Sequence, residues 1–567
     1  MTDAETSGQP ASQSRGLFVL LPSVLALVTH LPVLAAPLFW DDGRMLLDPR
    51  ALGRGNFWQE IFRLDYGLEF SGERAGYYRP LFVLLAWILH QLFGSSAVVY
   101  HAISLVAFVG LVAMASLLFR RCFADHPKLA LLLSCLFAVH PLNTDIVLFF
   151  TSLPDLVVAA AVAALLLLVR DKRPAALEAT VAGLLALVAA LFKESGFLAM
   201  APLAGVLLLG RRFAASGGAL VGLAIAMGMR LQADLLHVPA TALLAPLLPS
   251  GSGQGLQALF LHAQHFFLPV PRVGPRDPSA TGSILTSLAV LLLLKGPSSG
   301  IWWNIWKGNT ERALWWTWIF VTIHGLMTPP ALGLLYSERY GSLIPLIWLL
   351  GTALVEAERR FQPAAPRLKL LAKIGAIWVA LQGSAGMAGL WQALSARSYW
   401  TAVLKAEPNL VLGQLNLARA LRDEGDLAHA EKVMLTALKL APEDKRLQDS
   451  LLYLAETQFY LKKYDAALAT LAQRDSIAPG EAKTASLRAI CLFSAGRRVE
   501  AVAAIRAAMA AEPQSSNYRY QFLKIAAGEP SVSIEELIAV RNELVKAGSR
   551  LPEEAVDEAM LRRLHGT

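Results

Sequence analysis

Eleven long apolar segments between residues 17 and 391 constrain the fold more than any other feature of this 567-residue chain. Most of them approach the roughly 20 residues that an α-helix needs to cross a bilayer. Only 17% of the residues are charged, against about 25% in soluble domains. The expected spans are 17–38, 98–119, 129–148, 155–170, 177–193, 197–210, 214–231, 282–296, 312–328, 341–356 and 371–391. The sequence therefore predicts an all-α, polytopic membrane bundle over residues 17–393.

The distribution of basic residues predicts how this bundle is oriented. With an N-terminal tail, 1–16, in the cytoplasm, the inner loops carry sixteen Lys and Arg, whereas the later outer loops carry four. Such an excess is typical of the cytoplasmic side. The apolar run 81–93 must then be an interfacial helix or shallow hairpin arm, since a further span would invert every later loop. A large first outer loop, 39–97, and the part from 394 to 567 follow on the outer side.

Charge and cysteine content exclude two other classes of protein. From residue 395 onward, 23 basic residues face 22 acidic ones, so the net charge of +8 belongs almost entirely to the apolar part. Membrane orientation explains that excess better than phosphate contacts do, and no nucleic-acid partner is expected. The three cysteines, at positions 122, 135 and 491, are too scattered for a disulfide framework or a zinc site.

A repeat organises the polar C-terminal part. Prolines at 442, 479 and 513 are 37 and 34 residues apart, and an alanine stands 12 and 24 residues before each of them. This spacing is typical of the tetratricopeptide repeat (TPR), whose period is 34 residues. The predicted repeats cover 411–444, 448–479 and 482–513 and are followed by capping helices. Their concave groove would bind peptide; a rigid spacer or a dimer contact is the alternative.

The first outer loop opens with an acidic pair, Asp41 and Asp42, directly after a span. Adjacent carboxylates at a membrane face suit a general base, a metal site, or both. The alternative is a solvated helix cap, because Asp is common at helix starts. Arg79, in the motif YYRP, either binds a lipid phosphate or anchors its helix by snorkelling.

Further polar side chains end other spans on the predicted outer side. They lie in the motifs AVHPLNTD, SLPD, FKES and SERY and are His140, Asp145, Asp155, Lys193, Glu194, Glu338 and Arg339. Each has an ordinary explanation when taken alone, such as a buried histidine or an ion pair between neighbours. Their expected position on the same face as Asp41 and Asp42 favours a functional site, because polar groups at a membrane are costly.

In this order, followed by TPRs, these motifs resemble those of the transmembrane-and-TPR O-mannosyltransferases. That family belongs to the GT-C glycosyltransferases, which use polyprenyl-phosphate sugars. The resemblance covers nearly the whole chain, although the family often carries many more repeats. It implies that Asp41 or Asp42 is the base, with Asp42 as supporting carboxylate. Donor phosphate contacts fall on Arg79, Lys193 and Arg339, and acceptor or metal orientation on His140, Asp145, Asp155, Glu194 and Glu338.

The implied reaction moves a sugar from an undecaprenyl-type carrier in the membrane lipid to a hydroxyl acceptor, Ser or Thr of a protein or peptide in the TPR groove. Whether Mg²⁺ or Mn²⁺ takes part, at Asp42 and Asp155, stays open. Frequent Ala, Leu and Arg indicate a bacterial chain, which places the site and the TPRs in the periplasm at the inner membrane. The alternatives are a GT-C transferase for lipid or glycan acceptors and a non-catalytic membrane scaffold.

Overall fold

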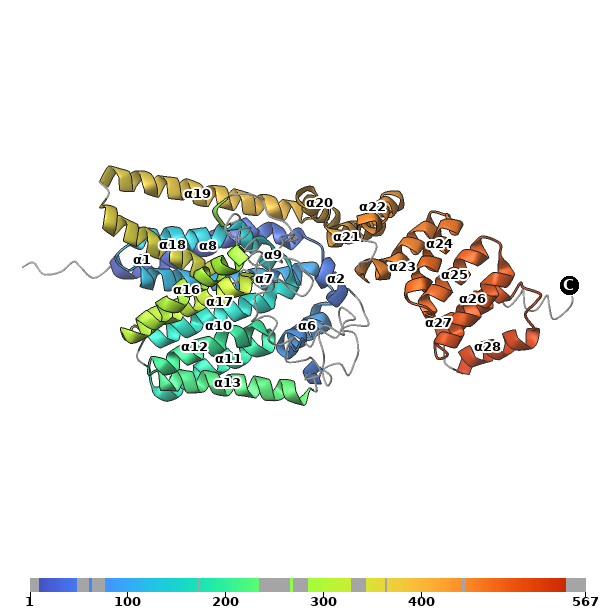
Figure 1. Cartoon of the computed structure of the whole chain (residues 1–567), viewed down its shortest axis with the longest axis horizontal. Coiled ribbons are helices and arrows are strands. Elements are labelled where there is room, and N and C mark those ends of the chain that lie inside the picture. Colours follow the sequence, from blue (N-terminus) through green and yellow to red (C-terminus); the bar gives the residue numbers. More distant parts are fainter. Residues whose placement is uncertain are drawn as a thin grey trace, which may run out of the picture. The chain divides into compact units, whose positions relative to one another are not determined.

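The computed structural model describes residues 10–47, 61–63, 77–171, 173–233, 266–268, 284–327, 343–362, 365–440 and 445–546. These residues are mostly helical and contain no strand, which confirms the all-α prediction (Figure 1). The chain divides into two compact units, residues 1–403 and 404–567. The predicted boundary at 393/394 therefore precedes the division by about ten residues, and helix α20 (Ala396–Ala406) crosses it.

The first unit is a bundle of helices. Its elements are α1 (Pro10–His30), η1 (Leu31–Ala35), α2 (Trp40–Leu46), η2 (Ile61–Arg63), α6 (Pro80–Phe93), α7 (Ala97–Cys122), α8 (Pro127–Val139), η3 (Pro141–Asn143), α9 (Thr144–Leu148), η4 (Phe150–Ser152), α10 (Leu153–Arg170), α11 (Ala175–Phe192), α12 (Ser195–Leu209), α13 (Phe213–Gln232), α16 (Ile284–Trp306), α17 (Thr310–Met327), α18 (Leu343–Phe361) and α19 (Ala365–Gln392). Helix α1 begins earlier than the expected span, so residues 10–16 of the predicted tail are helical.

Six of the described helices are long and apolar enough to cross a membrane. They are Gly16–Ala35, Ala97–Cys122, Phe150–Arg170, Ala175–Phe192, Phe213–Gln232 and Pro366–Gln392. A seventh span results if α8 and the residues Pro141–Leu148, which are bent by 43° relative to it, count as one. Helix α6, with 14 residues, is too short for a straight crossing, as the predicted orientation requires. The total of eleven spans stays a prediction.

Close packing of α11 on α13 depends on small residues. A Cβ atom at Gly218 would lie 2.0 Å from the carbonyl oxygen of Ala179, and one at Gly222 would lie 2.1 Å from that of Gly183. The two backbones therefore approach more closely than any larger side chain permits. In a bilayer, where no hydrophobic effect drives helices together, such van der Waals contact is a main source of association.

Polar and charged residues gather at two opposite ends of the bundle. The basic end holds the last turns of α7 and α10, where Arg170 lies 3.3 Å from Glu311 at the start of α17. The site end holds α2, the start of α10 with Asp155, and the turn between α11 and α12. Because α10 runs from Asp155 to Arg170, the two ends are separated by about 22 Å.

The second unit is a succession of helix pairs in which each helix packs against the next (Figure 1). They are α21 (Val411–Asp423), α22 (Leu427–Leu440), α23 (Lys445–Tyr460), α24 (Tyr464–Ile477), α25 (Ala482–Ser494), α26 (Arg498–Ala511), α27 (Ser516–Ala526) and α28 (Ile534–Lys546). The six alanines of the predicted repeat are all buried in this unit. The arrangement is compatible with a solenoid; its assignment to the TPR class stays a prediction.

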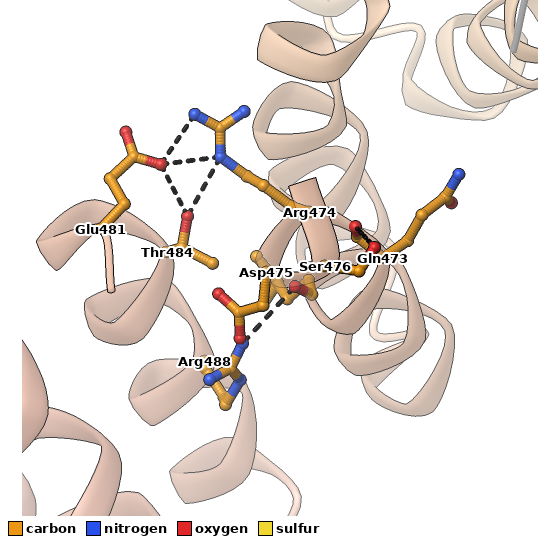
Figure 2. Close-up of polar contacts among 8 residues, drawn as sticks. Gln473, Arg474, Asp475, Ser476, Glu481, Thr484 and Arg488 are labelled. Atoms are coloured by element: carbon orange, nitrogen blue, oxygen red, sulfur yellow. Dashed lines mark hydrogen bonds and ion pairs between the residues drawn. The ribbon is translucent and has the colours of Figure 1, made fainter. Parts of the chain in front are cut away.

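A buried polar corner joins α24 to α25. Figure 2 shows Arg474, Glu481 and Thr484 directed toward one another. The Arg474 Nε donates to Glu481 over 2.8 Å, and the Thr484 hydroxyl donates to the same carboxylate over 2.9 Å. Burial raises the pKa of Glu481, but the hydrogen bonds from Thr484 and Arg474 outweigh it and lower that pKa below its usual value. Only 7% of Arg474 is exposed, so this network fixes the angle between the two helices.

Candidate active site

Asp42 is a buried anchor between two segments that lie far apart in the sequence. Its two carboxylate oxygens accept hydrogen bonds from the backbone N–H groups of Phe150, at 2.7 Å, and Thr151, at 2.8 Å. Burial raises the pKa of Asp42 to about 7, although these amide bonds act in the opposite direction. Because Asp42 is only 1% exposed and each of its oxygens accepts an amide hydrogen bond, it fixes α2 against η4 rather than facing a substrate.

Asp41 lies in a different environment, although it is the neighbouring residue. Its side chain is half-buried, at the start of α2. Burial raises the pKa of Asp41, while the charges of Arg44 and Arg79 oppose that rise. A carboxylate with a raised pKa is a better general base near neutral pH than an ordinary aspartate. The structure thus distinguishes two residues that the sequence could not: Asp41 is the accessible one.

An aromatic cluster holds the start of α2. Trp40 has a φ of +57°, in the left-handed region that bulky L-residues seldom adopt. Its ring packs edge-to-face on Phe149 and on Trp400, with 5.2 Å between centroids in both contacts. Phe39 packs in the same way on Tyr399, at 5.1 Å. Strain of this kind costs about 1–3 kcal/mol and persists only where surrounding contacts enforce it.

The Trp-Asp-Asp motif indicated the carboxylates, but it did not indicate the aromatic rings that support them. The available signals were two pairs of aromatic residues, at 149 and 150 and at 399 and 400, both more than 100 positions downstream. Arg44 was not among the predicted site residues, although it lies one helical turn after Asp41 and on the same side of α2. A polar residue at that spacing is a signal that could have been used.

Arg79 and Glu194 meet from two different elements. The Arg79 Nε donates to Glu194 Oε2 over 3.0 Å, and the backbone N–H of Tyr78 donates to Glu194 Oε1 over 2.8 Å. The guanidinium of Arg79 also lies over the ring of Tyr77, 4.9 Å from its centroid. The predicted phosphate contact is therefore already oriented by a carboxylate and an aromatic ring.

Lys193 and Glu194 do not share one interfacial ion pair, the ordinary alternative considered from sequence. The Lys193 Nζ instead lies 2.5 Å from Asp155 Oδ2, on α10, while Glu194 binds Arg79. The sharp turn between α11 and α12, which holds Lys193 and Glu194, requires a glycine at position 196. A Cβ at Gly196 would lie 2.3 Å from the carbonyl carbon and oxygen of Ala189. Two adjacent residues thereby connect α10 and the start of α6 to one turn.

His140 and Asp145, five positions apart, are both buried, and the ring of His140 contacts two backbone groups. The Nδ1 of His140 accepts from the N–H of Leu142 over 3.2 Å, and its Nε2 lies 3.1 Å from the carbonyl of Phe266. This assigns a proton to Nε2. Asp145 lies in the first turn of α9 and is 2% exposed. The acceptor-orienting role predicted for both residues stays a prediction.

The predicted metal site does not assemble from the described residues. Among the described residues, no three His, Cys, Asp or Glu side chains gather to hold an ion. Asp42 is bound by two amides and Asp155 by Lys193, so these two carboxylates do not fit a shared ion in this arrangement. Glu338 and Arg339, the last predicted contacts, lie outside the described residues.

Comparison with known proteins finds only partial similarity. No family model and no curated protein matches the sequence. Among solved structures, the "MamA RS-1 ArsTM double mutant" is 18% identical, covering 27% of this chain and 84% of its own, with a TM-score of 0.25. "MamA 41-end from Desulfovibrio magneticus RS-1" is 18% identical, covering 26% and 80%, with a TM-score of 0.24. At these TM-scores the similarity supports no argument about family or function.

Proposed function

We propose that this chain is an integral-membrane glycosyltransferase of the GT-C type, which moves a sugar from a polyprenyl-phosphate carrier to a hydroxyl group. The arrangement around Asp41 carries the proposal. This carboxylate has a raised pKa, lies within the field of Arg79, and stands at one end of a bundle of membrane-length helices. A lipid-linked sugar phosphate fits this arrangement, because its tail lies in the bilayer while its reacting bond lies at the helix ends, where Asp41 stands.

Asp41 is the proposed general base. Its carboxylate takes the proton of the acceptor hydroxyl while the oxygen attacks the anomeric carbon of the donor sugar. The bond between that carbon and the phosphate oxygen breaks, and polyprenyl phosphate leaves with the electron pair. Asp42 is a positioning residue, because its oxygens hold the amides of Phe150 and Thr151 and so keep α2 in place.

Arg79 is the proposed contact for the leaving phosphate. Its Nε donates to Glu194, and its planar, permanently charged guanidinium has a geometry that suits phosphate oxygens. Lys193 fits this role less well, because its ammonium lies 2.5 Å from Asp155. The acceptor is proposed to be Ser or Thr of a protein held by residues 404–567, acting as a TPR groove on the periplasmic side of a bacterial inner membrane.

A transfer assay in nanodiscs tests this proposal. It offers a panel of polyprenyl-phosphate sugars with a periplasmic extract as acceptor and compares wild type with Asp41→Asn. Removing the base should lower transfer by about 10²- to 10⁴-fold. The matched control is Asp125→Asn, which changes an exposed carboxylate in the turn after α7, at the basic end of the bundle.

The outcomes separate the proposal from its alternatives. Full transfer by Asp41→Asn would exclude Asp41 as the base. Sugar transfer to a glycan or lipid without any protein product would keep the enzyme class and replace the acceptor. The absence of transfer with every donor, together with specific protein capture through residues 404–567, would favour the non-catalytic scaffold.

A further inference from the structure

A groove at the basic end of the bundle combines an apolar floor with a basic rim. It has a volume of about 370 Å³ and runs between α10 and α11. Ala164, Leu167 and Leu168 line it from α10, and Leu177 and Val181 line it from the first two turns of α11. Ala164 lies about 9 Å along α10 from its last residue, so the apolar floor extends from the helix ends toward the middle of the bundle.

Two arginines form the rim, and their guanidinium groups make only long contacts with other groups of the protein. Arg121, at the end of α7, and Arg173, in the connection to α11, both line the groove. They approach the same carboxylate, Asp171, at 3.7 Å and 3.6 Å, which is beyond the usual length of a hydrogen bond. Arg121 makes one further long contact, 3.4 Å, to the carbonyl of Leu167. Their side chains remain 36% and 42% exposed.

We propose that this groove binds an anionic phospholipid, with its phosphate between Arg121 and Arg173 and an acyl chain along the apolar floor. Two guanidiniums around one acidic residue leave a local positive charge that a phosphate can neutralise with shorter, bidentate bonds. Basic pockets between membrane helices are the usual sites for anionic head groups. The proposal concerns the basic end, about 22 Å along α10 from Asp155 at the site end, and does not depend on the proposed transferase activity.

The floor distinguishes a lipid from a soluble phosphate. A free anion would need only the rim, and nothing would then fill the surface made by Leu177 and Val181, of which Leu177 is 45% exposed. A phospholipid contacts both parts, since its phosphate fits the basic rim and its acyl chain fits the apolar floor. We therefore commit to a lipid, and the experiment distinguishes it from inorganic phosphate.

Native mass spectrometry of the full-length protein in detergent tests the site with two added lipids, palmitoyl-oleoyl phosphatidylglycerol and the phosphatidylcholine with the same chains. Wild type should retain the anionic lipid preferentially. The double variant Arg121→Gln/Arg173→Gln should lower its affinity by about 30-fold, as the loss of two surface charges implies. The matched control, Arg359→Gln/Arg360→Gln, removes two exposed arginines from the last turn of α18 and should change little.

Two further variants exclude trivial loss of folding. Asp171→Asn removes the competing carboxylate and should strengthen retention of phosphatidylglycerol, which a misfolded protein would not do. Val181→Trp fills the floor without changing the charge and should weaken the lipid while leaving inorganic phosphate unaffected. Equal retention of both lipids by wild type, equal losses in the two double variants, or an unaffected Val181→Trp would overturn the proposal.

Discussion

The pKa of Asp41 is set by opposing effects: burial raises it, and the charges of Arg44 and Arg79 lower it. A base works in its ionised form, so transfer should fall as the pH drops through this raised pKa. Arg44→Gln removes one opposing charge and should move the acid limb of the pH profile to higher pH, with little change on the alkaline plateau. A profile of kcat/KM against pH measures this effect.

The matched control for this prediction is Arg312→Gln, an exposed arginine in the first turn of α17 at the basic end. Its charge is too distant from Asp41 to act through water and salt. The acid limb should therefore stay where it is in wild type. An acid limb that moves equally in both variants, or that does not move in Arg44→Gln, would contradict the role given to Asp41.

At the scale of elements, the turn from α11 to α12 depends on Gly196. A Cβ there would lie 2.3 Å from the backbone of Ala189, so Gly196→Ala must displace α12 and with it Lys193 and Glu194. We expect a loss of about 1–3 kcal/mol in stability and a large loss of transfer. Thermal unfolding in detergent measures the first, and Gly205→Ala is the control, because a Cβ at that position of α12 meets open space.

At the scale of the whole molecule, the division at 403/404 leaves Tyr399 and Trp400 with the membrane unit, where they pack on Phe39 and Trp40. A chain ending at residue 407 keeps these contacts and should still hydrolyse the donor with water. Its transfer to protein acceptors should fall at least about 10-fold, because the binding energy that residues 408–567 supply to the acceptor is removed. A chain ending at residue 393 loses the contacts and should lose both activities. Equal donor hydrolysis by the two chains would refute this role of α20.

The sequence by itself determined the class of fold and where to look for chemistry. Apolar runs of membrane length require helices, because every backbone polar group in a bilayer must be bonded within its own segment. The alanine and proline spacing likewise indicated the helix pairs of residues 411–511, and the acidic pair Asp41-Asp42 marked the end of a span. These features are local, so spacing along the chain is enough to reveal them.

Only the tertiary structure decided which residues contact one another. Asp42 is the anchor because amides more than 100 positions away reach it, and Lys193 and Glu194 separate because α10 and the start of α6 approach one turn from two sides. The left-handed backbone of Trp40 likewise depends on Trp400. Such pairings follow from the packing of helices against one another, and no periodicity within a single segment encodes that packing.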